Sequence, residues 1–245
     1  MTKNIQALLL IILFVFSHES ISGEPVRSVT NNALNYADST IESWAQSKFK
    51  NLRLIELDTN LRHDRTTDFR VLTMFELSGN DNKKSLSQIS FSSYDDRETL
   101  NLGLVWRNIN NAQTLIYGYN LFYDTEINTG HSRLGFGLEL KSSVYDVNLN
   151  FYEALSNKHD VNGAKEEAAD GYDLEVAMYL PYLPWAKVYY KGYEWDSSVY
   201  DVKHGESLSM HLQPTSRIAL EFGRQRDNTM STGLSFIKIE LYYLL

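Results

Sequence analysis

The segment YGYNLFYD, residues 117–124, alternates large apolar side chains with small or polar ones at every second position. Successive side chains of a strand point to opposite faces. One face of this strand would carry Tyr117, Tyr119, Leu121 and Tyr123. The other face would carry Gly118, Asn120, Phe122 and Asp124. The segment therefore predicts a strand with one apolar face and one mixed polar face.

The same period of two recurs in TLNLGLVWR (99–107), RLGFGLEL (133–140) and YDLEVAMYL (172–180). A soluble β-sandwich also alternates apolar and polar positions. Here, however, the apolar faces run for four or five positions and often end in Tyr or Trp. The opposite faces combine Gly, Asn, Asp, Glu and Arg, which suits the wet interior of a membrane barrel. The pattern favours transmembrane strands.

Extending the pattern along the chain predicts an all-β fold, a twelve-stranded antiparallel transmembrane barrel of the outer-membrane type. An even strand number suits a single-chain bacterial barrel. The expected strands are near 52–60, 69–77, 85–95, 99–109, 114–127, 131–143, 145–155, 171–181, 186–198, 203–213, 216–227 and 232–245. Tight periplasmic turns are expected at 110–111, 143–144 and 214–215, and surface loops at Leu77–Lys84, 128–130 and Asn157–Asp170.

Composition narrows the classes of function. The 245 residues include no Cys, which excludes thiol catalysis and disulfides, and carry a formal net charge of −8. Without a cluster of Lys and Arg, nucleic acid is not expected as a partner. Tyr, with 16 copies, exceeds Phe, with 11, and amphipathic aromatic rings suit membrane interfaces.

The N-terminus predicts export from the cytoplasm. Lys3 precedes a short apolar core, Ala7–Phe16, and Ser20-Ile21-Ser22 is a small-x-small cleavage site. These features predict a signal peptide over residues 1–22, since the core is too short for the alternative, an anchor helix. Residues 23–50 are expected to form a periplasmic or lumenal helical segment, with an amphipathic helix over 30–49. The barrel is expected over 51–245.

The final segment, FIKIELYYLL (236–245), stays amphipathic to the last residue. Such a strand suits a barrel that closes onto its first strand, and it resembles the C-terminal signal that the barrel-assembly machinery reads. The expected apolar face consists of Ile237, Ile239, Leu241, Tyr243 and Leu245.

Strand parity also predicts which polar side chains face the lumen. The candidates are Arg97, Asn101, Arg107, Asn120, Asp124, Arg133, Glu139, Asp173 and Glu175. Opposite charges on adjacent strands should pair, with Arg107 toward Asp124, and Arg133 toward Asp124 or Asp173. Glycines on the same face should leave room for these side chains to cross.

No catalytic residue, cofactor or metal site is predicted. A barrel phospholipase needs His-x-Ser, and this occurs here only at His18-Glu19-Ser20, within the expected signal peptide. An omptin-like protease could use Asp95-Asp96 or His159-Asp160, but acidic pairs on loops are usually solvated charges. The series Asp124, Glu126, Asn128 and Gly130 superficially resembles the start of a calcium loop, and a structural role is expected for it.

Three segments resemble the β-domain of the intimin and invasin family, the inverse autotransporters. They are YDDRETLNLGLVWR (94–107), YGYNLFYDTEINTGHSRLGFGLEL (117–140) and DGYDLEVAMYLPYLPWAKVYYKGYEWD (170–196). The resemblance covers about residues 30–245. It implies a twelve-stranded barrel in the bacterial outer membrane with its N-terminus in the periplasm, and a function in adhesion, virulence and protein secretion.

In that family a linker after the last strand threads the lumen and carries a passenger to the cell surface. This sequence ends at Leu245 without a linker or passenger, so the expectation is a stand-alone barrel. Such a barrel could export a separately encoded partner or act as a surface protein toward a host receptor. Its other expected partners are outer-membrane lipid, lipopolysaccharide and the barrel-assembly machinery. An outer-membrane enzyme and a passive pore are the alternatives.

Overall fold

The computed structural model describes residues 47–62, 67–94 and 97–244. The chain divides into two units, residues 1–52 together with Leu245, and Arg53–Leu244. In the first unit Ser47 and Lys48 are helical, and the Leu52 amide donates to the Phe49 carbonyl at 3.2 Å. The expected signal peptide and nearly all of the expected helix over 30–49 lie outside the described residues.

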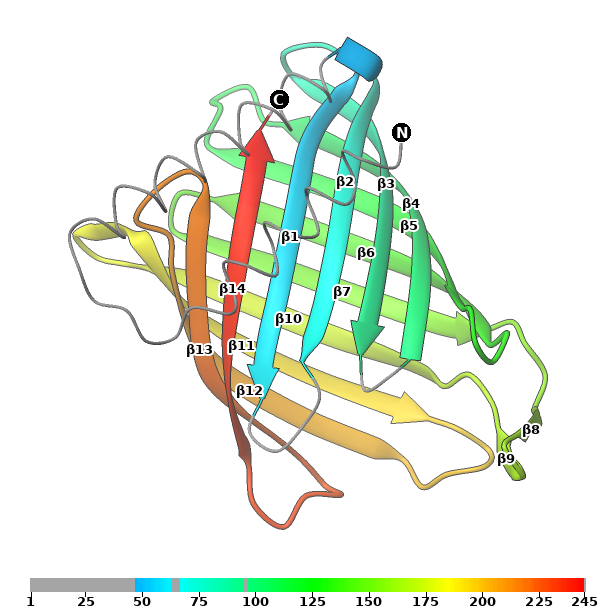
Figure 1. Ribbon diagram of the computed structural model, residues 1–245. Helices are drawn as coiled ribbons and strands as arrows, with labels where there is room; N and C mark the ends of the chain where they lie inside the picture. Colours follow the sequence, from blue (N-terminus) through cyan, green and yellow to red (C-terminus); the bar gives the residue numbers. More distant parts are fainter. Residues whose placement is uncertain (1–46, 63–66, 95–96, 245) are drawn as a thin grey trace, which may run out of the picture. The chain divides into compact units, whose positions relative to one another are not determined.

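The second unit is a closed antiparallel β-barrel, as Figure 1 shows. Its strands are β1 (Leu52–Arg62), β2 (Asp68–Gly79), β3 (Lys83–Tyr94), β4 (Arg97–Ile109), β5 (Leu115–Glu126), β6 (Ser132–Ser142), β7 (Tyr145–Ala154), β10 (Asp170–Leu180), β11 (Leu183–Asp196), β12 (Lys203–Leu212), β13 (Ile218–Asp227) and β14 (Leu234–Leu244). These are the twelve predicted strands, with bounds shifted by only a few residues. The period-two pattern therefore identified the fold correctly.

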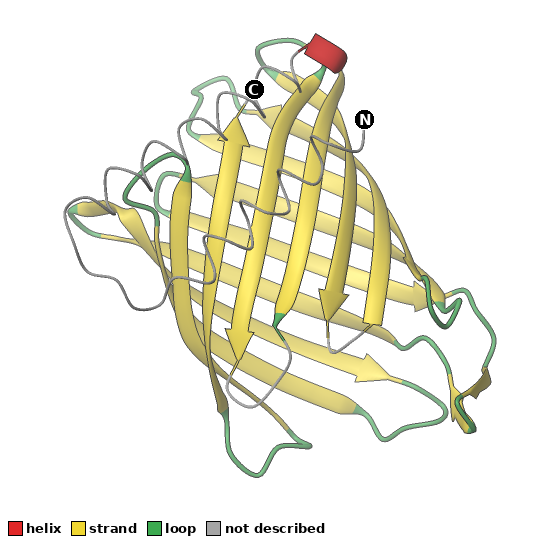
Figure 2. Ribbon diagram, in the orientation of Figure 1, coloured by secondary structure: helices red, strands yellow, loops and turns green. Residues whose placement is uncertain are grey.

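Strand β1 closes the barrel by pairing with the last strand, β14. Leu54 lies opposite Leu244, and Arg62 lies opposite Phe236. The remaining strands follow chain order around the wall, apart from the step from β7 to β10 (Figure 1). Strands form the wall, and loops and turns join them at its two ends (Figure 2). Closure leaves no open sheet edge, so every strand has a neighbour on both sides, as a membrane-spanning sheet requires.

A small hairpin interrupts the β7–β10 connection, where the sequence predicts only a loop. Its strands are β8 (His159–Val161) and β9 (Ala164–Glu166). The turn between them has Asn162 at φ 51° and Gly163 at φ 85°. Asn-Gly is the preferred pair for such a two-residue turn, because both residues must adopt positive φ.

The two ends of the barrel differ in their connections. At one end, the terminal end, β1 begins, β14 ends and five short turns join β2–β3, β4–β5, β6–β7, β10–β11 and β12–β13. The opposite end, the loop end, carries the β8–β9 hairpin and the described connections β5–β6, β11–β12 and β13–β14. The prediction of a surface loop at Leu77–Lys84 is wrong, because β2 and β3 extend to Gly79 and Lys83 and leave a short turn at the terminal end. Asn80 builds that turn, since its side-chain Oδ1 accepts from the Asn82 and Lys83 amides.

The barrel wall exposes apolar side chains and buries charged ones, which is the reverse of the distribution in a soluble protein. Leu102 and Leu121 are 43 % and 42 % exposed, whereas Asp124 and Asp173 on the opposite face are 9 % and 4 % exposed. Apolar surface on this scale is stable only where hydrocarbon replaces water around it. Among the described residues, no helix is long and apolar enough to cross a membrane.

Candidate functional site: the polar face of the barrel

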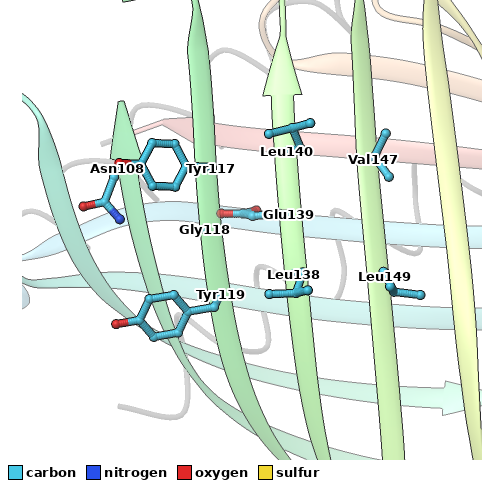
Figure 3. A pocket seen from close by; sticks show the side chains of 9 residues that line it. All are labelled: Asn108, Tyr117, Gly118, Tyr119, Leu138, Glu139, Leu140, Val147 and Leu149. Atoms are coloured by element: carbon cyan, nitrogen blue, oxygen red, sulfur yellow. The ribbon is translucent and has the colours of Figure 1, made fainter. Parts of the chain in front are cut away.

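Strand register sets the partners of the predicted charged residues. Arg107 lies opposite Gly118, and Gly118 lies opposite Glu139. The Arg107 guanidinium bridges over β5 and donates from Nη2 to Glu139 Oε2 at 3.0 Å, with a second bond from Nε. Figure 3 shows the Glu139 side chain extending toward Gly118. The prediction that Arg107 pairs with Asp124 is wrong, because Asp124 lies opposite Asn101, three residue pairs farther along β5 on the same face.

Gly118 makes this bridge possible. A Cβ atom at this position would lie 2.6 Å from Glu139 Oε1 and 2.6 Å from the Trp106 carbonyl oxygen. Real Cβ atoms do not approach other atoms so closely. The missing side chain therefore provides the space through which the two charged groups meet.

Asp124 is the centre of a second set of contacts. It accepts hydrogen bonds from Asn101 Nδ2 and from Arg133 Nε, the latter at 3.0 Å. The expected pairing of Arg133 with Asp124 is confirmed. The Arg133 guanidinium also lies over the rings of Tyr152 and Trp195, at 4.7 and 4.9 Å from their centroids, in cation–π geometry.

The alternative partner for Arg133, Asp173, is bound differently. Asn150 Nδ2 donates to Asp173 at 2.9 Å, the Tyr152 hydroxyl donates at 3.0 Å, and Lys191 Nζ lies 3.8 Å away. Glu175 accepts from Asn148 Nδ2 at 3.3 Å. Amide and phenol donors thus bind both carboxylates, and Arg133 pairs with Asp124 instead of Asp173.

Asn120 and Arg97 occupy different levels of the wall. Asn120 is buried beside Gly137, where a Cβ atom would collide with the Asn120 and Asn150 amides. Arg97 lies at the loop end and binds Glu126 at 3.1 Å and Glu166 at 2.8 Å. Because Glu166 belongs to β9, Arg97 fastens the β8–β9 hairpin to the barrel rim.

One row of residues around the wall alternates glycine with aromatic side chains. Register aligns Gly103, Phe122, Gly135, Tyr152, Gly171 and Trp195 across six consecutive strands. A Cβ atom at Gly103 would lie 2.6 Å from the Phe122 ring, and one at Gly171 would lie 2.6 Å from the Trp195 ring. Each large ring therefore lies over a glycine on the neighbouring strand.

A charged cluster at the β1–β14 seam escaped the sequence analysis. Arg70 on β2 binds Glu56 and Asp58 on β1, with Nε 2.7 Å from Asp58 Oδ2. Lys238 on β14 binds Glu240 and lies 3.6 Å from Asp58. The signal was available, because alternation in 52–62 and 236–244 places Glu56, Asp58, Lys238 and Glu240 on the polar parity.

The predicted C-terminal apolar face is only partly exposed. Ile237 is 52 % exposed and Tyr243 is 6 % exposed. In the pairing with β1, Ile239 lies opposite Thr59 and Leu241 lies opposite Leu57. Leu245 lies outside the described residues, and an assembly role for this strand stays a prediction.

The calcium-like series is used for structural contacts. Asp124 binds Arg133, while Glu126 binds Arg97 and accepts from the Thr129 hydroxyl. Within the part of the chain that the structure describes, no three His, Asp or Glu side chains are grouped to hold a metal ion.

The closed wall, apolar on one face and cross-linked by polar side chains on the other, defines a β-barrel of the bacterial outer membrane. The family model for the inverse autotransporter β-domain matches residues 15–243. The chain belongs to that family.

Its curated relatives include an invasin and an intimin. It is 36 % identical to invasin of Yersinia enterocolitica over 102 residues, which are 40 % of this chain and 12 % of invasin. It is 31 % identical to intimin of Escherichia coli O157:H7 over 170 residues, which are 66 % of this chain and 17 % of intimin. The chain thus spans less than a fifth of the length of either relative.

Solved structures share the fold. A chain from a study of in-meso crystallisation of membrane proteins superimposes with a TM-score of 0.73 at 16 % identity, covering 79 % of this chain and 84 % of that one. Outer membrane phospholipase A from Escherichia coli gives a TM-score of 0.51 at 11 % identity, covering 79 % of this chain and 90 % of that one. Identity this low shows the barrel fold alone.

Proposed function

We propose that this chain is the membrane translocator of an adhesin system, a barrel whose polar interior conducts a polypeptide to the cell surface. The observation that carries the proposal is the set of ion pairs that reach across an intervening strand. Arg107 on β4 reaches Glu139 on β6, and Lys187 on β11 reaches Asp146 on β7 at 2.8 Å. Side chains converge in this way on the concave side of a curved sheet and diverge on the convex side.

The same geometry supports a lumenal location for the nine predicted polar residues. Those with cross-strand partners share a face with the bridging pairs, and the opposite face carries the exposed Leu and Tyr side chains. In such a lumen the charged side chains are paired with each other or hydrogen-bonded. A passing polypeptide would meet polar contacts there without a strong net positive or negative potential. An interior of this kind suits an unfolded segment of mixed composition.

Orientation follows from connection length. Outer-membrane barrels have short periplasmic turns and longer external loops. The terminal end would then face the periplasm, and the β8–β9 hairpin would lie at the cell surface. The barrel-assembly machinery would read β14, a signal peptide over 1–22 would direct export, and lipopolysaccharide would surround the loop end.

A display experiment tests the translocator proposal. A small reporter domain with an epitope is fused after Leu245 through a flexible linker and expressed in an Escherichia coli strain. The proposal expects the epitope to be accessible to antibody and added protease on intact cells. A control with the same leader and reporter, but without residues 51–245, should stay protected. Heat-modifiable, assembled barrel with a fully protected reporter would contradict the proposal.

Within the part of the chain that the structure describes, the enzyme alternative has a geometric candidate, a contact between His131 Nδ1 and Ser156 Oγ at 3.3 Å. A serine nucleophile needs a histidine oriented by a third polar group. Here His131 stacks on His159, with ring centroids 4.1 Å apart, and Ser156 Oγ already accepts from the Ser132 amide at 3.0 Å. We propose a structural role for this pair. Phospholipase activity that Ser156→Ala abolishes in the folded protein would overturn that role.

A passive pore is the other alternative, and planar-bilayer recordings distinguish it from a translocator filled by its own polar side chains. Steady, large single-channel steps from the refolded barrel would favour the pore. Silence would favour an interior filled by the polar side chains of the wall.

A further inference from the structure

Two histidines from different loops stack at the loop end of the barrel. His131 precedes β6, and His159 begins β8 in the hairpin of the β7–β10 connection. Their ring centroids lie 4.1 Å apart, with an angle of 27° between the planes. This stack is a direct contact between the hairpin and the β5–β6 loop, so the charge of the two rings affects how the hairpin is held.

The partners of His159 fit a fully protonated ring. Its Nδ1 lies 3.1 Å from the Asn157 carbonyl oxygen, and its Nε2 lies 2.5 Å from the Thr129 carbonyl oxygen. A carbonyl oxygen only accepts hydrogen bonds, and neutral imidazole has a single N–H. Both contacts can be hydrogen bonds only when both ring nitrogens carry hydrogen, which makes His159 a cation.

The surroundings of His131 favour a neutral ring. Ser156 Oγ accepts from the Ser132 amide, which leaves its own hydroxyl hydrogen free to donate to His131 Nδ1. His131 is 7 % exposed, and burial disfavours the charged form. A second cation would also lie directly against the His159 ring.

We infer that His131 and His159 form a binding site for one proton, and that the singly protonated pair fastens the β8–β9 hairpin to the β5–β6 loop. Adding a second proton puts two cations in contact. Removing the first proton leaves one carbonyl oxygen without its donor. Docking of the hairpin is therefore strongest with one proton on the pair and weaker with two protons or none.

The charged groups around the pair affect how readily His131 takes up the second proton. Burial lowers the pKa of His131, and the neighbouring His159 and Arg97 on β4 lower it further. Glu126 on β5 and Glu166 on β9 act in the opposite direction and raise this pKa. A histidine with a lower pKa in the docked state binds its proton more readily once undocked. Acid below the ordinary histidine pKa therefore favours release.

Release would be confined to one side of the hairpin. Toward the β11–β12 loop, the Tyr200 hydroxyl donates to the Lys165 carbonyl at 3.2 Å, and Glu167 accepts from the Ser197 and Ser198 hydroxyls. These bonds involve no histidine. The hairpin would lose its histidine contact with the β5–β6 loop, while these bonds and the Arg97–Glu166 ion pair at the rim still hold it.

Spin-label mobility tests the inference, because the chain has no native Cys. A nitroxide is attached at Ala164→Cys in the refolded full chain, and its spectrum is recorded from pH 4 to pH 9. We expect an immobilised spectrum at intermediate pH and at least a twofold increase of the mobile fraction at the acidic end. A mobile fraction that does not change across this range would refute the inference.

Two variants assign the effect to the pair. His131→Phe keeps a stacked ring but cannot take the second proton, so the acid release should disappear. His159→Gln cannot form the imidazolium, so the mobile fraction of its hairpin should be at the raised, acidic level at every pH. Heat-modifiability confirms that each barrel is folded, and His131→Gln replaces His131→Phe if the phenyl ring prevents folding. Unchanged acid release in the folded His131 variant would show that other groups sense the proton.

Discussion

Leu102 and Asn101 are neighbours on β4, yet they lie in opposite surroundings. Leu102 is 43 % exposed and points away from the polar face. Asn101 donates to Asp124 and accepts from Gln88 Nε2 at 3.3 Å. A single step along a strand thus separates a side chain that contacts hydrocarbon from one that belongs to a hydrogen-bonded network.

Arginine substitutions at these two positions should have opposite outcomes. Leu102→Arg places a charge on the lipid face, at a cost of roughly 2–4 kcal/mol near the bilayer midplane. Asn101→Arg places the charge beside Asp124, which can pair with it. We expect Leu102→Arg to reduce the heat-modifiable, assembled barrel in outer-membrane fractions and Asn101→Arg to leave it near the unsubstituted level. Equal tolerance of both would mean that the assigned faces are wrong.

Gly118 has a steric role that a matched substitution can isolate. Gly118→Ala should destabilise the barrel by about 1–3 kcal/mol, the usual range for overpacking, since Glu139 and the Trp106 carbonyl must shift. The control is Gly192→Ala, because an added Cβ there meets its nearest atom, the Tyr190 hydroxyl oxygen, at 3.5 Å. Urea unfolding in lipid vesicles measures both variants. A Gly118→Ala barrel as stable as the Gly192→Ala barrel would contradict the steric account.

At the scale of elements, the period-two pattern predicted the features that depend on the sequence of a single strand. It missed the features that depend on how two or more strands pair. All twelve strands were found, because each needs only alternation within its own sequence. The Arg107–Glu139 bridge was missed because it requires the register of three strands and a glycine between the charges. The β8–β9 hairpin was missed because strands of three residues are too short to show alternation. The Leu77–Lys84 turn was misassigned, because its polar residues resemble a loop while the strands continue into it.

The two ends of the barrel should differ in accessibility. An epitope inserted between Asn162 and Gly163 lengthens a hairpin tip at the loop end, whereas one inserted between Asn80 and Asp81 lengthens a turn at the terminal end. On intact cells we expect antibody to bind the first insertion and not the second. After permeabilisation of the outer membrane both should bind. The reverse pattern would invert the proposed orientation.

At the scale of the whole molecule, the barrel wall carries its exposed apolar side chains on one face and its buried charged side chains on the other. The sequence predicted this distribution by parity, and the structure adds the closure between β1 and β14 and the bridges across strands. The function proposed for the interior depends on that closure, since an open sheet would expose its edge strands and its polar face to lipid.

The measurement that tests this claim most directly is an accessibility scan along β5 in lipid vesicles. Single cysteines carrying a nitroxide replace successive residues from Tyr119 to Asp124, and collision with dissolved oxygen, which concentrates in hydrocarbon, is recorded for each. The account predicts high oxygen accessibility at Tyr119, Leu121 and Tyr123 and low accessibility at Asn120, Phe122 and Asp124, a period of two whether or not the lumen is filled. Uniform accessibility along the strand, or a maximum at the polar positions, would contradict a membrane barrel with a polar interior.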